Sequence, residues 1–98
     1  MAWMYIIFSD KLDRYYIGAT NDEVEHRINK HNNGTYGSSH FTARACDWIL
    51  KLAMECDDYP HAIRLERKIK SMKSRKYIAN LLKYSEMRER IIKETSNT

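Results

Sequence analysis

Five side chains of this 98-residue chain combine a reactive group with an unusual position. Two are tyrosines in separate aromatic and β-branched runs near the N-terminus. An arginine and a histidine lie four residues apart, the spacing that makes residues neighbours on one helix face. The fifth is a glutamate within an apolar helical stripe, where a carboxylate is costly unless it is paired or binds a cation. The five candidates are Tyr5, Tyr16, Arg27, His31 and Glu66.

Glu66 carries the strongest individual signal of a binding function. It falls on the apolar face of a helix expected over residues 60–73. Partnered carboxylates in such positions are common metal ligands, and the structural alternative is an ion pair with Arg27 or with a neighbouring lysine such as Lys70. Taken singly, the other four candidates are better explained by packing, since tyrosines favour strands and a long cationic side chain can extend from a stripe to water.

The two tyrosines are predicted to lie on a β-hairpin formed by residues 3–8 and 14–19, with a polar turn between them. In an antiparallel pair, directly opposed residues share one sum of residue numbers, and side chains alternate between faces. An odd sum, produced by a loop of even length, places Tyr5 and Tyr16 on the same face, whereas an even sum separates them. If the tyrosines act together, the register sum must be odd.

The remaining pattern predicts an α+β fold in one domain. A third strand is expected at residues 48–54, and its apolar side chains on both faces favour a position buried in a covered sheet. The expected fold is a small three-stranded antiparallel sheet flanked by helices over about residues 22–32, 60–73, 75–83 and 85–93, in a single domain of residues 1–94 with a frayed tail at residues 95–98.

Local signals mark where the helices begin. Thr20 and Glu23 have capping-box spacing, and Asn21 is an equally good cap for the first helix. Asp58 suits the positive end of the second helix, and Ser74 can cap the third. Both docking on the domain and dimerisation are compatible with the last helix.

The charge distribution favours a polyanionic partner, foremost nucleic acid. The net charge is +4, and no acidic residue occurs between positions 67 and 85, where basic residues are frequent. A solvated helix face would give the same run. Phosphate contacts are expected from a loop arginine and from this basic segment: Arg44, Lys68, Lys70, Lys73, Arg75 and Lys76.

Composition also bears on the cellular compartment. The chain has no stretch of roughly 20 apolar residues as a membrane span requires, and its apolar N-terminus lacks a basic leader and a cleavage site. Cys46 and Cys56 have neither zinc-site nor disulfide-framework spacing. We therefore expect a cytoplasmic protein with free thiols and no membrane partner.

Together, these residues resemble the GIY-YIG nuclease family. The resemblance lies in Met4-Tyr5-Ile6 and Tyr16-Ile17-Gly18, in Arg27-x-x-x-His31, and in Glu66, and it covers roughly residues 2–83. The chain is most similar to the small single-domain members of the family, which are related to the nuclease domain of the repair protein UvrC. Met4 replaces the first glycine of the family motif, but its side chain should face away from Tyr5, so little catalytic consequence is expected.

The resemblance implies an endonuclease that hydrolyses DNA phosphodiester bonds with one divalent metal ion, Mg²⁺ or alternatively Mn²⁺, in DNA repair or recombination. Glu66 would hold the metal, Arg27 would bind the scissile phosphate, and Tyr16 would orient water or phosphate. Tyr5 would accept the proton of the attacking water, and His31 could either supply positive charge beside it, as Arg27 does, or relay the proton. Which of Tyr5, Tyr16 and His31 is the general base stays open. Because an unperturbed phenol has a pKa of about 10, Tyr5 would need nearby positive charge for this role.

Other interpretations remain open from the sequence. A non-catalytic nucleic-acid-binding module could keep the same fold, and a homodimeric scaffold could use the last helix. Branched DNA, damaged DNA and RNA all fit a basic surface, and both a monomer and a homodimer are compatible with the pattern.

Overall fold

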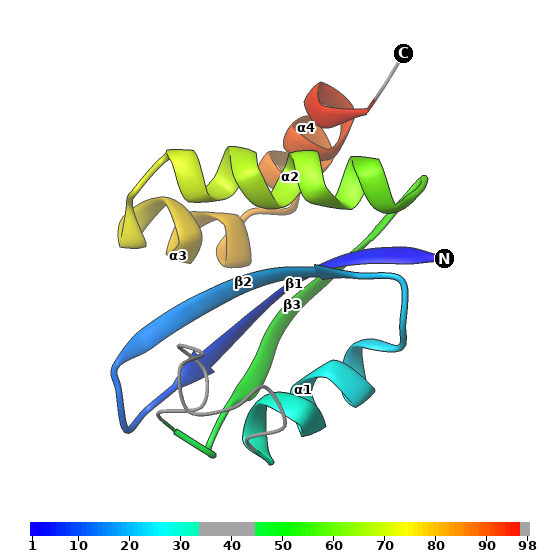
Figure 1. Ribbon diagram of the computed structural model, residues 1–98. Coiled ribbons are helices and arrows are strands. Elements are labelled where there is room, and N and C mark those ends of the chain that lie inside the picture. The colour runs from blue at the N-terminus through cyan, green and yellow to red at the C-terminus, as the bar shows by residue number, and fades with distance from the viewer. Residues whose placement is uncertain (34–44, 97–98) are drawn as a thin grey trace.

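A computed structural model of the chain describes residues 1–33 and 45–96. It confirms the predicted α+β fold: a three-stranded antiparallel sheet lies between α1 on one face and α2, α3 and α4 on the other (Figure 1). The elements in chain order are β1 (Ala2–Ser9), β2 (Arg14–Thr20), α1 (Val24–Asn32), β3 (Ile49–Cys56), α2 (Tyr59–Ser71), α3 (Arg75–Lys83) and α4 (Ser85–Thr95).

β1 is the central strand, in the order β2-β1-β3, and it supplies both cores of the molecule. Met4 and Ile6 pack with residues of α2, α3 and α4, whereas Tyr5 and Ile7 pack toward α1 with Trp48. None of these four β1 side chains has exposed surface. Alternation along a single covered strand thus separates a mainly apolar core beneath the three helices from a second core that contains the candidate tyrosines.

The prediction that the third strand is buried on both sides is wrong. β3 is an edge strand, and Ile49 and Leu50 remain 53% and 40% exposed. Only the second half of the strand is covered, where Met54 and Cys56 join the core beneath the helices. An apolar pattern on both faces therefore does not distinguish an edge strand from a central one when the covering layer is short.

The capping box predicted for the first helix is also wrong. α1 begins at Val24, and its N-cap residue Glu23 makes no side-chain capping hydrogen bond. The Thr20 hydroxyl instead accepts from the Asp22 amide at 2.9 Å, and the Asp22 carboxylate accepts from the Glu23 amide at 2.8 Å. These bonds satisfy backbone amides of the turn that precedes the helix, so neither Thr20 nor Asn21 caps the helix.

The other two helix starts agree with the sequence prediction. Asp58 accepts a hydrogen bond from the His61 amide at 2.9 Å, with Pro60 in the first turn of α2. Ser74 accepts from the Tyr77 amide at 3.0 Å at the start of α3. Side-chain oxygens that satisfy free amides of the first turn fix where both helices begin.

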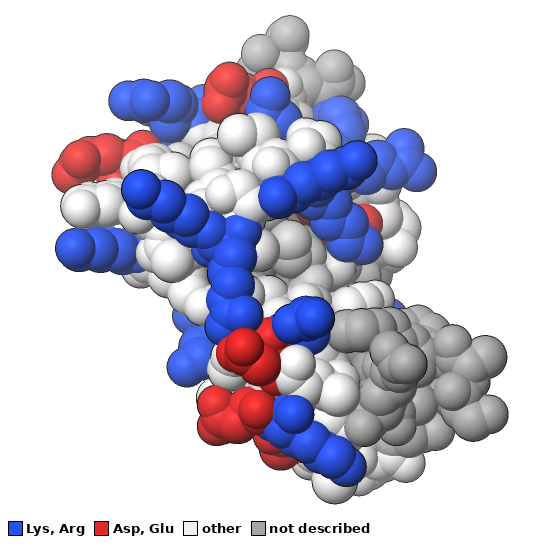
Figure 2. Space-filling model, turned by 90° about the vertical axis from the view of Figure 1, so that its left-hand side faces the viewer, with Lys and Arg blue, Asp and Glu red and all other residues white. Residues whose placement is uncertain are grey.

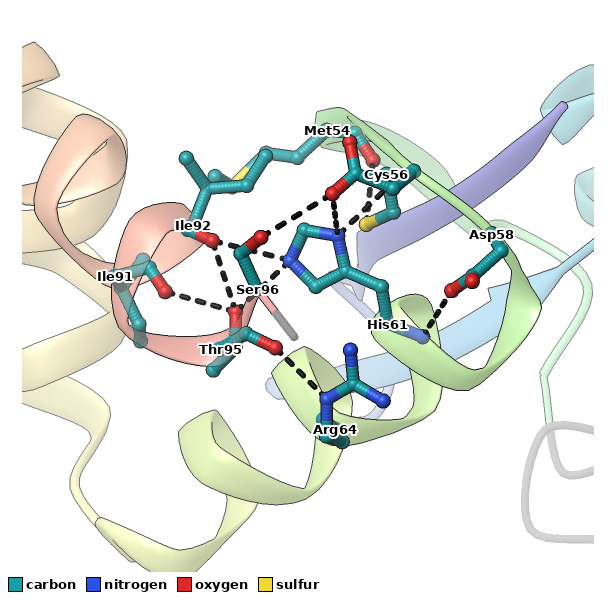
Figure 3. Close-up of polar contacts among 10 residues, drawn as sticks. Met54, Cys56, Asp58, His61, Arg64, Ile91, Ile92, Thr95 and Ser96 are labelled. Atoms are coloured by element: carbon teal, nitrogen blue, oxygen red, sulfur yellow. Dashed lines mark hydrogen bonds and ion pairs between the residues drawn. The ribbon is translucent and has the colours of Figure 1, made fainter. Parts of the chain in front are cut away.

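A buried histidine fastens α4 to α2 (Figure 3). His61 Nδ1 accepts from the Asp57 amide at 3.1 Å, so Nε2 carries the proton and faces the Ile92 carbonyl and the Thr95 hydroxyl, each at 3.1 Å. Arg64 Nε donates to the Thr95 carbonyl at 2.8 Å. The last helix therefore docks on the domain, one of the two roles that the sequence left open.

This contact corrects the predicted frayed tail at its first residue, Thr95, whereas residues 97–98 of that tail lie outside the described part of the chain. Glu94 and Thr95 continue α4, and Thr95 is only 8% exposed. Its hydroxyl also donates to the Ile91 carbonyl at 2.8 Å. A polar side chain near a terminus gave no indication of burial because its partner, His61, is far away in the sequence.

Two further observations concern the cysteines and the length of the helices. Cys46 is exposed and Cys56 is buried, and both are free thiols, as predicted. Among the described residues, no helix combines the length and apolar character needed to cross a membrane.

We predict that His61→Ala lowers the free energy of unfolding by about 2–4 kcal/mol, because it leaves a cavity and removes the partners of buried polar groups on α4. Urea unfolding followed by circular dichroism would measure the change. His26→Ala, at an exposed position on α1, is the matched control and should stay within about 0.5 kcal/mol of wild type. Equal effects of the two substitutions would contradict a fastening role for His61.

Candidate active site

The hairpin register places both candidate tyrosines on one face of the sheet. Tyr5 lies opposite Gly18, and Ile7 lies opposite Tyr16, so the residue numbers of opposed pairs add to an odd sum. Four residues, 10–13, form the loop between the strands. The odd register predicted for a shared tyrosine site is confirmed.

Tyr5 is positioned by the absence of a side chain on the neighbouring strand. Its ring has no exposed surface and crosses directly over Gly18. A Cβ atom at position 18 would lie 2.5 Å from both Cζ and Oη of Tyr5, closer than non-bonded atoms can approach. The final glycine of the second motif is therefore needed to leave room for the tyrosine of the first.

His31 lies between the two tyrosines. Its Nε2 atom is 2.9 Å from the Tyr5 hydroxyl, and its ring centre is 5.1 Å from that of Tyr16. The imidazole is 1% exposed, at the last turn of α1. A buried histidine hydrogen-bonded to a buried phenol can exchange a proton with it without solvent rearrangement.

The neighbouring residue Asn32 fixes this end of α1. Its side-chain oxygen accepts from the Trp48 amide at 2.7 Å, and its nitrogen donates to the Trp48 carbonyl at 3.1 Å. Trp48 is buried and its ring lies edge-on to Tyr16, with 6.4 Å between centroids. Sequence reasoning missed both residues, because their pairing joins segments 16 residues apart and leaves no local pattern.

Arg27 lies one turn before His31 on α1 and is partly buried. Its guanidinium is close enough to Tyr16 to lower the pKa of that hydroxyl. It also lines a small polar cavity of about 250 Å³ beside the end of β2, together with Lys30 and Tyr59. Arg27 thus adds positive charge next to the two tyrosines and the histidine.

Glu66 approaches from the opposite layer of the molecule. It lies on α2, across the sheet from α1, and its carboxylate pairs with Lys70 at 3.1 Å (Figure 1). The Lys70 ammonium lies 5.6 Å from the centre of the Tyr16 ring. The ion pair with Lys70 is one of the two structural explanations that the sequence offered for Glu66, and it places the carboxylate beside the edge strand β2.

Tyr16 connects the groups from the two layers electrostatically. The pKa of its hydroxyl is raised, mainly by burial and to a smaller extent by the Glu66 carboxylate, while Arg27 opposes both effects. Tyr16 therefore stays protonated at neutral pH and can donate a hydrogen bond. The structure brings Tyr5, His31 and Tyr16 into contact and places Arg27 and Glu66 within electrostatic reach of Tyr16.

The residues predicted to contact phosphates do not form one surface. Lys70, Lys73 and Arg75 line a groove beside β2, whereas Lys68 faces a different hollow with Arg67. Lys76 is exposed on α3, and Arg44 lies outside the described residues. Figure 2 shows basic side chains spread over the upper part of the face turned toward the viewer, with acidic side chains both among them, at the upper left and top, and in a cluster lower down.

No group of three or more His, Cys, Asp or Glu side chains is placed to share a metal ion within residues 1–33 and 45–96. Glu66 is therefore considered as a single-carboxylate ligand, a donor set that suits Mg²⁺, which commonly keeps several of its waters.

Comparison with known proteins adds independent information. A family model described as the GIY-YIG catalytic domain matches residues 1–78, the part of the chain that contains all five candidates. No curated protein and no solved structure matches the chain.

We predict that Gly18→Ala destabilises the protein by about 1–3 kcal/mol, because the new Cβ collides with the Tyr5 ring. The test is a double-mutant cycle measured by urea unfolding. In a Tyr5→Leu background the same substitution should cost clearly less, since leucine lacks the atoms that Cβ would meet. Equal costs in the two backgrounds would show that the collision is not the reason for glycine.

We also predict a difference in alkaline stability between wild type and Tyr16→Phe. A raised folded-state pKa means that Tyr16 contributes its full stability below the unfolded pKa of about 10 and loses it as pH rises through the folded value. Between pH 9 and pH 11, wild type should lose more free energy of unfolding than Tyr16→Phe. Parallel pH profiles from urea titrations would contradict the assignment.

Proposed function

The chain belongs to the GIY-YIG nuclease family, and we propose on this basis that it is an endonuclease that hydrolyses phosphodiester bonds in DNA with one bound divalent metal ion, Mg²⁺ or Mn²⁺. One observation carries the proposal: a cation, Arg27, and a carboxylate, Glu66, from opposite layers both act on the hydroxyl of Tyr16, whose ring lies against His31. A module that only binds nucleic acid needs the cation but has no need of the carboxylate.

Glu66 fits the role of metal ligand. Its side chain is 15% exposed, and the Lys70 ammonium at 3.1 Å indicates that this position accommodates positive charge. When bound, the metal would supply Lewis-acid stabilisation of the charge that develops on the phosphate. Lys70 is 49% exposed on the helix surface, so its flexible side chain can move away from the carboxylate.

Arg27 and Tyr16 are suited to binding the scissile phosphate. A guanidinium donates directional hydrogen bonds to phosphate oxygens and remains charged at any physiological pH. Tyr16, kept protonated by burial and by Glu66, can donate to a phosphate oxygen or hold the attacking water. Both groups stabilise negative charge that increases toward the transition state.

Tyr5 and His31 together are suited to act as the base. When Nε2 of His31 is unprotonated, the Tyr5 hydroxyl donates to it across 2.9 Å. Tyr5 oxygen can then accept a proton from the attacking water while its own proton passes to Nε2. This route avoids a free phenolate, so it does not require the strongly lowered pKa that a tyrosine base alone would need.

The resemblance to members related to the UvrC nuclease domain supports a role in DNA repair or recombination. The packing of α4 bears on the oligomeric state. Its apolar residues Ile91 and Ile92 already pack on this domain. That packing supports a monomer over a dimer built on α4.

We predict that Glu66→Gln, which keeps the shape of the side chain but removes its charge, lowers the cleavage rate by at least about 10²-fold. Linear, nicked, flapped and branched DNA would be incubated with each protein in Mg²⁺ and in Mn²⁺ and resolved on gels. Glu55→Gln, at an exposed position on β3, is the control and should cleave like wild type.

DNA binding measured in EDTA separates chemistry from binding. Glu66→Gln should bind within about twofold of wild type, since the substitution removes no cation. A Glu66→Gln protein as active as wild type would contradict the mechanism. Wild-type protein that binds every substrate but cleaves none in either metal would instead favour the non-catalytic binding module.

A further inference from the structure

A groove of about 410 Å³ runs along β2 on the face of the sheet opposite Tyr5. Its other wall is the junction of α2 with α3. We call it the hairpin–helix groove. Its floor is apolar and consists of Ile17, Ile69 and Ile78, while its rim is cationic. A groove of this size that combines an apolar floor with a few charged groups suits a small organic ligand or part of a larger one.

The rim selects for a negatively charged occupant. Arg14, Lys70, Lys73 and Arg75 line it with a single acidic residue, Asp13. That carboxylate is already neutralised, because Arg75 Nη2 lies 2.6 Å from its oxygen. Among the described residues, no acidic side chain pairs with Lys73, so its charge is available at the mouth of the groove.

The groove is already formed without a ligand. Arg75 donates to both the carbonyl and the carboxylate of Asp13 and lies 5.6 Å from the rings of Phe8 and Tyr15. These contacts join the hairpin loop to the first residue of α3. An arginine that holds both walls together shapes the groove and leaves phosphate binding to its neighbours.

The groove is continuous with the candidate active site across the edge of the sheet. Tyr15 lines the groove and the next residue, Tyr16, points to the opposite face of β2. Lys70 belongs to both places, since it lines the groove while its ammonium lies 3.1 Å from Glu66 and 5.6 Å from the Tyr16 ring centre. A strand whose phosphate lies near Glu66 would therefore meet Lys70 at the rim of the groove.

We propose that the hairpin–helix groove binds an unpaired nucleotide next to the scissile phosphate, with its base on the isoleucine floor and its own phosphate near Lys73. The proposal rests on the proposed nuclease function and refines its substrate class. A base held in a duplex is stacked and paired, so it must be extruded or already single-stranded to reach an apolar floor. The protein should consequently prefer DNA with unpaired nucleotides at the cleavage position, such as flaps and branches, over fully paired duplex.

Binding without cleavage tests the proposal independently of catalysis. The full chain in EDTA would be titrated into a labelled single-stranded oligonucleotide and into a blunt duplex of the same sequence, read by fluorescence anisotropy. Lys73→Asn removes the charge at the groove with a residue that tolerates the positive φ of 47° at this position. Lys93→Asn removes the same charge from an exposed position on α4, outside the groove, and is the matched control.

Lys73→Asn should weaken single-strand binding by about tenfold, and Lys93→Asn by less than about twofold. Wild-type protein should bind the duplex less tightly than the single strand. Equal losses in the two variants would indicate a general basic surface and overturn the proposal. So would equal affinity for duplex and single strand.

A second measurement addresses the base directly. Isoleucine methyl resonances would be followed during titration with a short oligodeoxyadenylate and with an abasic strand of the same length. The methyls of Ile17, Ile69 and Ile78 should shift with the adenylate and not with the abasic strand, because only a base adds a ring current. Silent methyls would overturn the proposal even if Lys73→Asn weakens binding. A protein that cleaves paired duplex and flaps equally, with silent methyls, would retain the nuclease function and lose the groove assignment.

Discussion

The contact between the Tyr5 ring and the bare backbone of Gly18 is the constraint on which the candidate site depends. The ring fits only because position 18 has no Cβ, and it lies there only because the hairpin pairs residue 5 with residue 18. The same register puts Tyr16 on the same face, next to the His31 imidazole, which is hydrogen-bonded to the Tyr5 hydroxyl. Changing the loop by one residue would turn one of the tyrosines to the other core, away from His31.

The edge position of β2 explains how a site on one face of the sheet can use a carboxylate from the other. A central strand would separate Glu66 from Tyr16 by the thickness of the sheet and by the strands beside it. At an edge, side chains from both layers can meet around the strand. The pKa of Tyr16 indicates this: burial raises it most, Glu66 from one layer raises it further, and Arg27 from the other layer lowers it. Successive residues of β2 then serve different surfaces, Tyr15 in the hairpin–helix groove and Tyr16 in the candidate active site.

Much of the fold could be predicted because its signals are local. The alternation of side chains and the turn composition predicted the hairpin. Asp58 and Ser74 predicted two helix starts, because each caps its helix by a hydrogen bond within one turn. The failures involve partners that are distant in sequence. The exposure of Ile49 follows from which helices cover the sheet, and the burial of Thr95 depends on His61, 34 residues earlier. For the site, the resemblance to the GIY-YIG family predicted the grouping of Tyr5, Tyr16 and His31, because each residue taken singly was better explained by packing. The requirement for Gly18 and the support from Asn32 need coordinates.

The pair formed by Glu66 and Lys70 also bears on how the site can change state. An ion pair whose cation is half exposed contributes little to stability, on the order of 1 kcal/mol or less, so it yields readily to a competing charge. Lys70 is a rim residue of the hairpin–helix groove as well, and its flexible side chain can reach either the carboxylate or an anion in that groove. An anionic ligand in the groove would draw Lys70 away from Glu66, and a cation bound at Glu66 would replace Lys70 there. The binding of each should therefore favour the binding of the other. Coupling of this kind would link the binding of an unpaired nucleotide to the readiness of the site for cleavage.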